Sequence, residues 1–427
     1  MPVASIGTPS LRNVVSALLI AALMIAGALV IAQDQETLRV RSPLGAKDGR
    51  FPEYLARLLG APLTSGNLYI VHTNGEAAFP AMLDAIGRAR HRVSLETYIY
   101  NRGEIANRFT AALEAAARRG VEVRLVLDSV GAKMMDPEHV KRLTDAGCRI
   151  VWFNQVSGFG LQELNYRTHR KSLVVDGTVA FLGGIGIADA WDRDSATGPA
   201  WRDTQIEVRG PAAVYIEGSF NENWIESGEV VEPTVNPFDT AAPGGAQSVV
   251  VWSSPESGAN GMKLLYLLAI GSARKSLDIE SPYLITDSST EWSLEDARRR
   301  GVRVRLLVEG DITDAKPVKF ASRAAYERLL EHGIEIYEYQ PAMFHAKVMV
   351  VDDVLAVVGS ANFDNRSLEL NDELSVAVFD PHLAARLLTD MERDITRSRK
   401  LDLANWRARP LHIRARDQFW SFFGEVF

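Results

Sequence analysis

Residues 169–176 read His-Arg-Lys-Ser-Leu-Val-Val-Asp, and residues 345–352 read His-Ala-Lys-Val-Met-Val-Val-Asp. The histidine, lysine and aspartate of the two stretches are related by one constant offset of 176 residues, which also relates Gly183 to Gly359. A single His-x-Lys triplet is common on protein surfaces, whereas two extended copies at a fixed offset are hard to obtain by accident. The repeat predicts one site built by two related half-domains, each contributing a histidine and a lysine to a shared phosphate.

The surrounding sequence repeats as well, which extends the duplication to whole half-domains. Arg-Arg-Gly-Val-Glu-Val-Arg-Leu at 118–125 is echoed by Arg-Arg-Gly-Val-Arg-Val-Arg-Leu at 299–306. Asp-Ala-Gly-Cys-Arg-Ile at 145–150 is echoed by Glu-His-Gly-Ile-Glu-Ile at 331–336. In each half, helical patterns alternate with short β-branched runs, and glycines stand where helices should stop. This alternation predicts an α/β fold made of two duplicated domains.

Turn signals mark the boundary between the halves. Asn-Pro and Ala-Ala-Pro-Gly-Gly within residues 235–247 favour a linker there. The expected organisation is an N-terminal segment 1–33, a connecting segment 34–64, a first half 65–234, the linker 235–247, a second half 248–400, and an aromatic and basic tail 401–427. The tail suits either an interfacial segment or a C-terminal helix packed on the core, and the packed helix is favoured.

Composition limits the classes of function. The chain of 427 residues is 47% hydrophobic and 24% charged, which suits one or two globular domains with substantial cores. Its net charge of −7 gives no general attraction to polyanions, which argues against nucleic acid as the partner. The single cysteine, Cys148, excludes an intramolecular disulfide and a cysteine-rich metal site. The chemistry therefore need not use a metal or a nucleotide cofactor.

The N-terminal segment differs from the rest of the chain in its apolar composition. Residues 14–32 are apolar except for Ser16, with Arg12 before them and Gln-Asp-Gln-Glu after them. A membrane span needs about 20 apolar residues, whereas the apolar region of a signal peptide usually has about 7–15. Length therefore favours a single membrane span, and Arg12 favours a cytoplasmic N-terminus with an exported body. The alternative is a cleaved signal and a secreted protein.

The paired motif resembles the phospholipase D superfamily, and the residues around it resemble its bacterial cardiolipin synthase branch. The matching stretches are 167–177, 183–189, 201–204, 344–347, 359–367 and 371–373. The resemblance covers roughly residues 65–400. It implies two phospholipase D-like domains, each a mixed β-sheet flanked by helices, with one shared active site at their interface.

The resemblance also assigns chemical roles. An imidazole nucleophile, His169, would attack the phosphodiester and form a phosphohistidine intermediate. His345 would protonate the leaving alcohol and then activate the acceptor. Lys171 and Lys347 would stabilise negative charge on the phosphate oxygens. This mechanism invokes neither a metal nor a cofactor.

Further residues support this pair of histidines. Each imidazole needs an acceptor on its other nitrogen, and the family pattern pairs Asp203 with His345 and Glu373 with His169. The residues that complete the motif, Asp176 and Asp352, precede turns and are interpreted as structural supports of the site. The residues expected to contact substrate are Gly184, Ser360 and Asn362. Two further acids, Glu96 and Glu280, either line the cleft or are ordinary structural acids.

One position departs from the family pattern. Gly186 stands where the second half has Asn362, so one side-chain donor to the phosphate is missing or replaced. The sequence therefore predicts that Gly186→Asn keeps or raises activity.

The resemblance implies a phosphatidyltransferase that acts on phospholipid phosphodiesters at a membrane and transfers the phosphatidyl group to an alcohol or lipid acceptor. Alternatives within the superfamily are a phospholipase D that uses water and a phosphodiesterase that cleaves nucleic acid. No obligate protein partner is implied.

Overall fold

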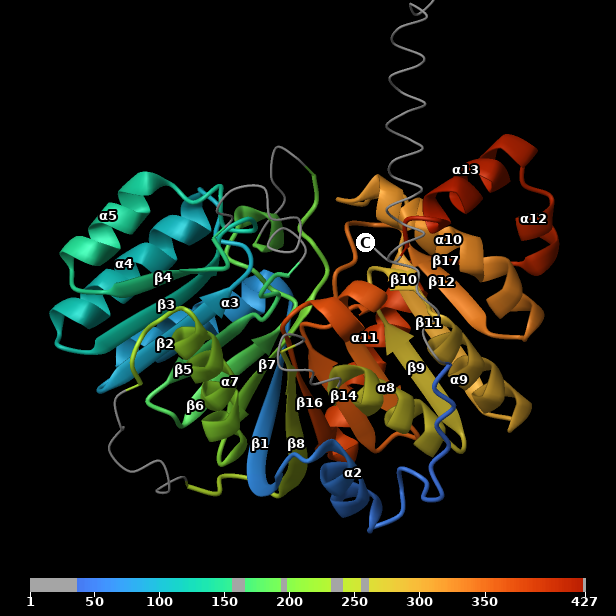
Figure 1. Cartoon of the computed structure of the whole chain (residues 1–427), viewed down its shortest axis with the longest axis horizontal. Coiled ribbons are helices and arrows are strands. Elements are labelled where there is room, and N and C mark those ends of the chain that lie inside the picture. Colours follow the sequence, from blue (N-terminus) through green and yellow to red (C-terminus); the bar gives the residue numbers. More distant parts are fainter. Residues whose placement is uncertain (1–36, 156–165, 193–197, 232–240, 255–260, 425–427) are drawn as a thin grey trace, which may run out of the picture.

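The computed structural model of the chain describes residues 37–155, 166–192, 198–231, 241–254 and 261–424. Within these ranges, fifteen strands form one continuous mixed sheet with helices on both faces (Figure 1). A separate two-stranded sheet pairs β10 with β15. The predicted α/β fold with duplicated domains is confirmed.

The strands of the first half are β1 (Leu63–Thr73), β2 (Arg92–Thr97), β3 (Glu122–Asp128), β4 (Arg149–Phe153), β5 (Ser172–Val175), β6 (Val179–Gly183) and β7 (Thr204–Arg209). Those of the second half are β8 (Ala246–Ser253), β9 (Ser276–Glu280), β10 (Leu284–Ile285), β11 (Arg303–Glu309), β12 (Glu335–Tyr339), β13 (Val348–Val351), β14 (Leu355–Gly359), β15 (Phe363–Asp364), β16 (Glu373–Phe379) and β17 (Ser398–Lys400).

The helices up to the middle of the chain are α2 (Phe51–Leu59), α3 (Asn74–Arg88), α4 (Glu104–Arg118), α5 (Pro137–Asp145), the short 3-10 helix Asp189–Trp191 and α7 (Ala212–Glu226). Those that follow are α8 (Gly261–Ser272), α9 (Ser288–Arg299), α10 (Lys316–Glu331), the short π-helix Arg366–Leu370, α11 (Pro381–Ile395), α12 (Leu403–Arg407) and α13 (Leu411–Ser421).

The strand order shows the duplication directly. From the centre outward, the first half runs β1-β7-β6-β5-β2-β3-β4 and the second runs β8-β16-β14-β13-β9-β11-β12, with β17 at the outer edge. In both runs the first five strands pair antiparallel and the last three pair parallel. The halves join through the antiparallel pair β1 and β8, where Leu63 faces Val249. The two half-sheets therefore form one scaffold.

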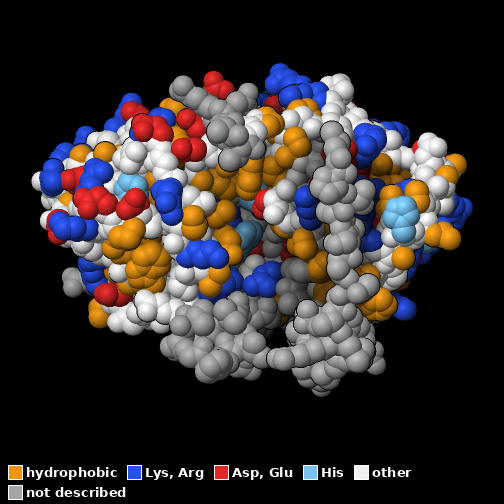
Figure 2. Space-filling view, turned by 90° about the horizontal axis from the view of Figure 1, so that it is seen from above, with side chains coloured by type: hydrophobic (Ala, Val, Ile, Leu, Met, Phe, Trp, Pro, Cys, Tyr) orange, Lys and Arg blue, Asp and Glu red, His pale blue; other side chains and the backbone are white. Residues whose placement is uncertain are grey.

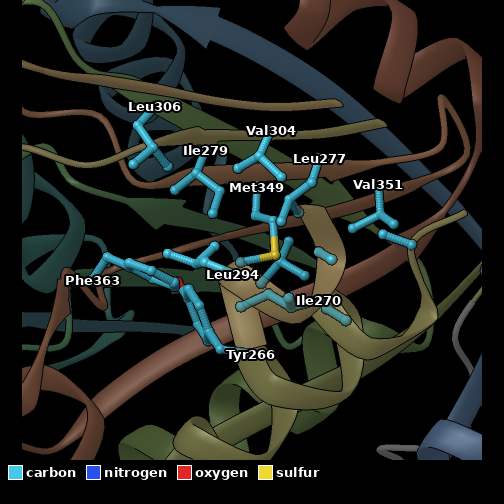
Figure 3. Packing of buried hydrophobic residues seen from close by; sticks show 14 of the residues in the cluster. Tyr266, Ile270, Leu277, Ile279, Leu294, Val304, Leu306, Met349, Val351 and Phe363 are labelled. Atoms are coloured by element: carbon cyan, nitrogen blue, oxygen red, sulfur yellow. The ribbon is translucent and has the colours of Figure 1, made fainter. Parts of the chain in front are cut away.

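Alternation along the strands separates an apolar face from a charged one. In β9, Leu277 and Ile279 pack with Met349 of β13 in the hydrophobic core beneath α8 and α9 (Figure 3). The residue between them, Asp278, points to the opposite face, where it accepts a hydrogen bond of 2.6 Å from Nε of Arg305. This buried carboxylate is therefore paired with a guanidinium, which offsets the cost of its desolvation.

Two helices tie the halves together on the same face of the sheet. α7, from the first half, contacts β8, and α11, from the second half, contacts β1. Their apolar residues enter one shared core, in which Ile216 of α7 and Leu387 of α11 are buried with strand residues from both halves. This core positions the halves relative to each other.

The tail packs on the second half. Trp406 of α12 is buried, and its ring lies 5.4 Å from that of Tyr326 on α10. α13 lies against α10, while Phe419 and Phe422 remain exposed. The tail is thus a pair of short helices on the core, as in the favoured expectation.

The expectation of a membrane span is corrected. Across the described ranges, none of the helices is both long enough and apolar enough to cross a bilayer. The apolar stretch 14–32 lies outside the described residues. The predicted localisation, a single N-terminal span with an exported body or a secreted form, has no support in the structure.

Asp176 and Asp352 hold equivalent hairpin turns. Each turn follows β5 or β13, at the end of the strand opposite to the motif histidine. Asp176 accepts hydrogen bonds of 2.8–3.0 Å from the backbone N–H groups of residues 90–92. Asp352 accepts bonds of 2.7–2.9 Å from those of residues 274–276. Both have φ of +52°, a region that aspartate and asparagine tolerate better than most residues. The four-residue strand that lies between each histidine and its aspartate is about 13 Å long.

We predict that Asp352→Asn lowers the free energy of unfolding by about 2 kcal/mol, because it removes the charge and one acceptor oxygen facing three amides. Asparagine keeps the left-handed backbone, so the loss reports the hydrogen bonds. Urea denaturation followed by circular dichroism measures it. The matched control is Asp353→Asn. Asp353 has φ of +60°, and among the described residues its carboxylate pairs with the exposed Lys47 and Lys275. Equal losses in both variants would contradict the assigned role.

Candidate active site

A cavity of about 320 Å³ lies where β2 and β9 end and β5 and β13 begin. Seen from above, this face of the molecule is hollowed at its centre, where histidine colour shows among hydrophobic and basic side chains (Figure 2). The cavity is lined by Tyr98, Ile99, Arg167, His169, Lys171, Tyr283, Asp314, Val318, His345, Asn362, Asp364, Arg366 and Asn371. The two repeated histidines, 176 residues apart in the chain, therefore meet in one site.

Each histidine is bonded to an acid from the opposite half. Nδ1 of His169 donates to Oε1 of Glu373 at 2.8 Å, and Nδ1 of His345 donates to Oδ2 of Asp203 at 2.8 Å. The backbone repeats this exchange. The N–H of His169 donates to the carbonyl of Asp372, and the N–H of His345 donates to the carbonyl of Arg202. The structure thus brings together both pairs that the family pattern implied.

These bonds select the tautomer of each imidazole. A carboxylate accepts the Nδ1 proton, which leaves the lone pair of Nε2 for the cavity. The carboxylates are held in turn. Asp203 accepts from Nε1 of Trp191 at 2.8 Å and from the N–H of Thr204 at 2.8 Å. Glu373 accepts from the hydroxyl of Ser360. Both imidazoles are therefore oriented before any substrate binds.

Burial sets the protonation of the histidines. It lowers the pKa of His169 to about 4, against the opposing charge of Glu373, so this imidazole is neutral near pH 7. Burial and then Lys347 lower the pKa of His345. For the two acids, burial is the largest influence and raises the pKa, but the facing histidine, the nearby lysine and the hydrogen bonds together outweigh it, and the pKa of each is lowered. Asp203 and Glu373 are therefore carboxylates that favour a charged imidazole beside them.

The lysines of the motif are buried next to the histidines. Nζ of Lys171 donates to the carbonyl of His169 at 2.8 Å, and Nζ of Lys347 donates to that of His345 at 2.6 Å. Burial lowers the pKa of Lys171 to about 7 and that of Lys347 to about 8. The negative charge of a bound phosphodiester would favour the ammonium forms. Each lysine has further N–H groups for a phosphate oxygen.

The three residues expected to contact substrate fall in different places. Asn362 lines the cavity, and its Oδ1 has no hydrogen-bond partner among the described residues. Gly184 and Ser360 instead lie behind the orienting acids. A Cβ on Gly184 would lie 2.3 Å from Oδ1 of Asp203, so the glycine makes room for that carboxylate. Ser360 bonds Glu373 in the equivalent place.

Glu96 and Glu280 are structural acids and are not among the residues that line the cavity. Glu96 accepts hydrogen bonds from the hydroxyl of Thr168 at 2.6 Å and from Nδ2 of Asn223 at 2.7 Å, beneath the cavity. Burial raises the pKa of Glu96 to about 7 and that of Glu280 to about 8. Arg170, inside the first motif, is buried in the same layer and donates to the carbonyls of Ser219 and Ser253. It anchors the motif to both halves.

Sequence reasoning missed Trp191. Its indole N–H bonds Asp203, and its ring meets that of His345 edge-on at 5.5 Å. In the first half it supplies the donor that Ser360 supplies in the second. The motif carries no signal for it, because Trp191 lies in a short 3-10 helix beyond the motif, and the residue at the same offset in the second half is Ser367.

Gly186 has no room for the side chain that its counterpart carries. A Cβ there would lie 2.9 Å from Cβ of Ile99 and 3.2 Å from the ring of Trp191. Gly186 is also buried and does not line the cavity. An asparagine at 186 would therefore clash with its neighbours, and the expectation that it restores a phosphate contact is replaced by an expected loss of stability.

We predict that Gly186→Asn destabilises the protein by about 1–3 kcal/mol, because it overpacks the space against Trp191. The measurement is the urea midpoint of the variant against that of the parent. Gly87→Asn is the matched control, since a Cβ at Gly87 meets nothing within 4 Å. A Gly186→Asn protein as stable as the parent would show that the space exists after all.

Comparison with known proteins agrees with this geometry. The sequence pattern of the family described as "Cardiolipin synthase, PLD-like domain" matches residues 82–197 and 266–395. The chain is 32% identical over 381 residues to a cardiolipin synthase of Geobacillus sp. (strain WCH70), covering 87% of this chain and 75% of that protein. It is 33% identical over 365 residues to a cardiolipin synthase of Alkalihalophilus pseudofirmus, covering 84% and 72%.

A solved structure shares the fold. The phosphatidylserine synthase of Haemophilus influenzae Rd KW20 superposes with a TM-score of 0.67 at 12% identity, covering 88% of this chain and all of that one. One segment of the family pattern falls in each half of the sheet, and the resemblance drawn from the motifs is confirmed. The chain belongs to the cardiolipin synthase family of phospholipase D-like proteins.

Proposed function

We propose that this protein is a phosphatidyltransferase that moves a phosphatidyl group from a phospholipid donor to an alcohol acceptor, with cardiolipin as the product when both are phosphatidylglycerol. The observation that carries the proposal is the exchanged pairing of His169 with Glu373 and of His345 with Asp203 around one cavity. Two preorganised imidazoles can serve as nucleophile and as proton carrier for a two-step displacement.

In the first step, Nε2 of His169 attacks the phosphorus of the donor. A phosphorus–nitrogen bond forms and the bond to the headgroup oxygen breaks. His345 enters this step as the imidazolium, protonated on both nitrogens, and gives its Nε2 proton to that oxygen. The neutral state of His169 supports its role as nucleophile, since a protonated imidazole has no lone pair to attack with. Asp203 and Glu373 both stabilise a charged imidazole, so this pairing is common to the two histidines. We assign His345 as the acid because the family pattern places the nucleophile in the first motif.

In the second step, an acceptor alcohol takes the place of the departed headgroup. His345, now neutral, removes the hydroxyl proton, the oxygen attacks phosphorus, and the bond to Nε2 of His169 breaks. Lys171 and Lys347 would stabilise the charge on the phosphate oxygens in both steps. Hydrolysis differs only in that water is the acceptor, so the two histidines do not distinguish a transferase from a phospholipase D.

The test of the function is a product analysis. Purified protein is incubated with phosphatidylglycerol vesicles, with and without added glycerol, and the lipids are resolved by mass spectrometry. We expect cardiolipin to form and added glycerol to suppress it, because glycerol is the other product of that transfer. Phosphatidic acid alone would identify a phospholipase D, and inert lipid beside cleaved DNA would identify a nuclease.

The histidine roles are tested with a phosphatidyl p-nitrophenyl ester, whose leaving group needs no proton. We predict that His345→Gln still forms the covalent adduct and then turns over at least about 100-fold more slowly, since the second step lacks its base. His169→Gln should form no adduct. Rapid quenching and peptide mapping locate the phosphate, and an adduct on His345 would reverse the roles.

A further inference from the structure

A tyrosine and an aspartate form a hydrogen-bonded pair in the wall of the catalytic cavity. Tyr283 follows β9 and Asp314 precedes α10, so both belong to the second half. The hydroxyl of Tyr283 donates to Oδ1 of Asp314 at 2.5 Å. Both side chains line the cavity together with His345, and Oδ2 of Asp314 accepts no hydrogen bond from any described residue. The carboxylate of Asp314 is thus an exposed part of the cavity wall, with one oxygen held by Tyr283 and the other able to accept a hydrogen bond.

The first half does not repeat this pair. Tyr98 occupies the place equivalent to Tyr283, and its ring meets that of His169 edge-on at 5.3 Å. The loop beside it approaches through Gly131, where a Cβ would lie 2.6 Å from the Tyr98 ring. Asp128, at the end of β3, turns Oδ1 to the N–H groups of Val130 and Gly131. The pair of hydroxyl and carboxylate is therefore confined to the side of the second half.

That side is the one where alcohols enter and leave under the proposed function. In an in-line displacement with His169 on one side of the phosphorus, the leaving oxygen lies on the other side, where His345 protonates it. The acceptor oxygen must approach from the same direction. Asp314 lies on this side, and its negative charge contributes to the electrostatic environment of His345 and Lys347.

We propose that Asp314, held by Tyr283, selects a polyhydroxylic acceptor by accepting hydrogen bonds from the hydroxyl groups of a glycerol headgroup that do not react. The inference rests on the proposed function and names its acceptor class. A glycerol headgroup presents two further hydroxyls beside the phosphoryl oxygen when it leaves from phosphatidylglycerol. The same moiety presents hydroxyls when it attacks as the acceptor, so one pair of residues serves both steps. Water and monohydric alcohols lack the second hydroxyl and gain nothing from Asp314.

The test uses the second step alone. The phosphatidyl p-nitrophenyl ester forms the same phosphoenzyme whatever the acceptor, and the partition of that intermediate among water, glycerol and ethanol is read from the lipid products. In Asp314→Ala, we expect the preference for glycerol over water to fall about tenfold or more, as expected for losing a hydrogen bond to a charged group. The preference for ethanol over water should stay unchanged. Tyr283→Phe should shift the glycerol preference in the same direction by less.

Asp311→Asn is the matched control, since Asp311 is an exposed aspartate three residues away that pairs with Arg399. The partition of the phosphoenzyme among acceptors is a ratio, so it does not depend on how much of a variant folds. Asp314→Asn provides a second, isosteric variant. Unchanged glycerol partition in both Asp314 variants would overturn the inference while leaving the transferase intact. A parent protein that transfers to no alcohol would instead overturn the proposed function, and the inference with it.

Discussion

The hydrogen bonds that cross between the halves, from His169 to Glu373 and from His345 to Asp203, are the constraint on which the site depends. An imidazole works as nucleophile or proton carrier only when its other nitrogen is held, and here the holding group always belongs to the other half. The halves must therefore keep their relative position to within roughly 0.5 Å. The continuous sheet through β1 and β8, and the shared core under α7 and α11, provide that rigidity.

Duplication gives the site two equivalent walls, and the chemistry needs them to differ. The motif residues and the strand order are repeated, so the scaffold is symmetric. The differences are small and local. In the first half Trp191 supports the orienting acid behind a glycine, while in the second half Ser360 does so directly. Asp314 lines the cavity beside Tyr283, whereas the equivalent tyrosine of the first half, Tyr98, packs against Gly131. Such differences distinguish the attacking side from the side of the alcohols.

Buried charge is extensive around this site, and most of it is arranged in pairs. Asp278 with Arg305, and Arg170 with Glu222, lie in the layer between the sheet and its helices. Replacing one partner of such a pair leaves an uncompensated charge in a dry environment, which is strongly destabilising. Residues of this layer are therefore expected to affect the stability of the fold more than the choice of substrate.

The sequence by itself determined the duplication, the α/β class, the family, and which histidines and lysines meet, because a repeated motif at a constant offset constrains both halves at once. The tertiary structure decided what each supporting residue touches. Gly184 and Ser360 proved to lie behind the acids, Gly186 proved to be too crowded for asparagine, and Trp191 and Asp314 carried no motif at all. The reason is physical: motif spacing reflects the strand that holds a residue, whereas steric room, burial and hydrogen-bond partners come from segments distant in the chain.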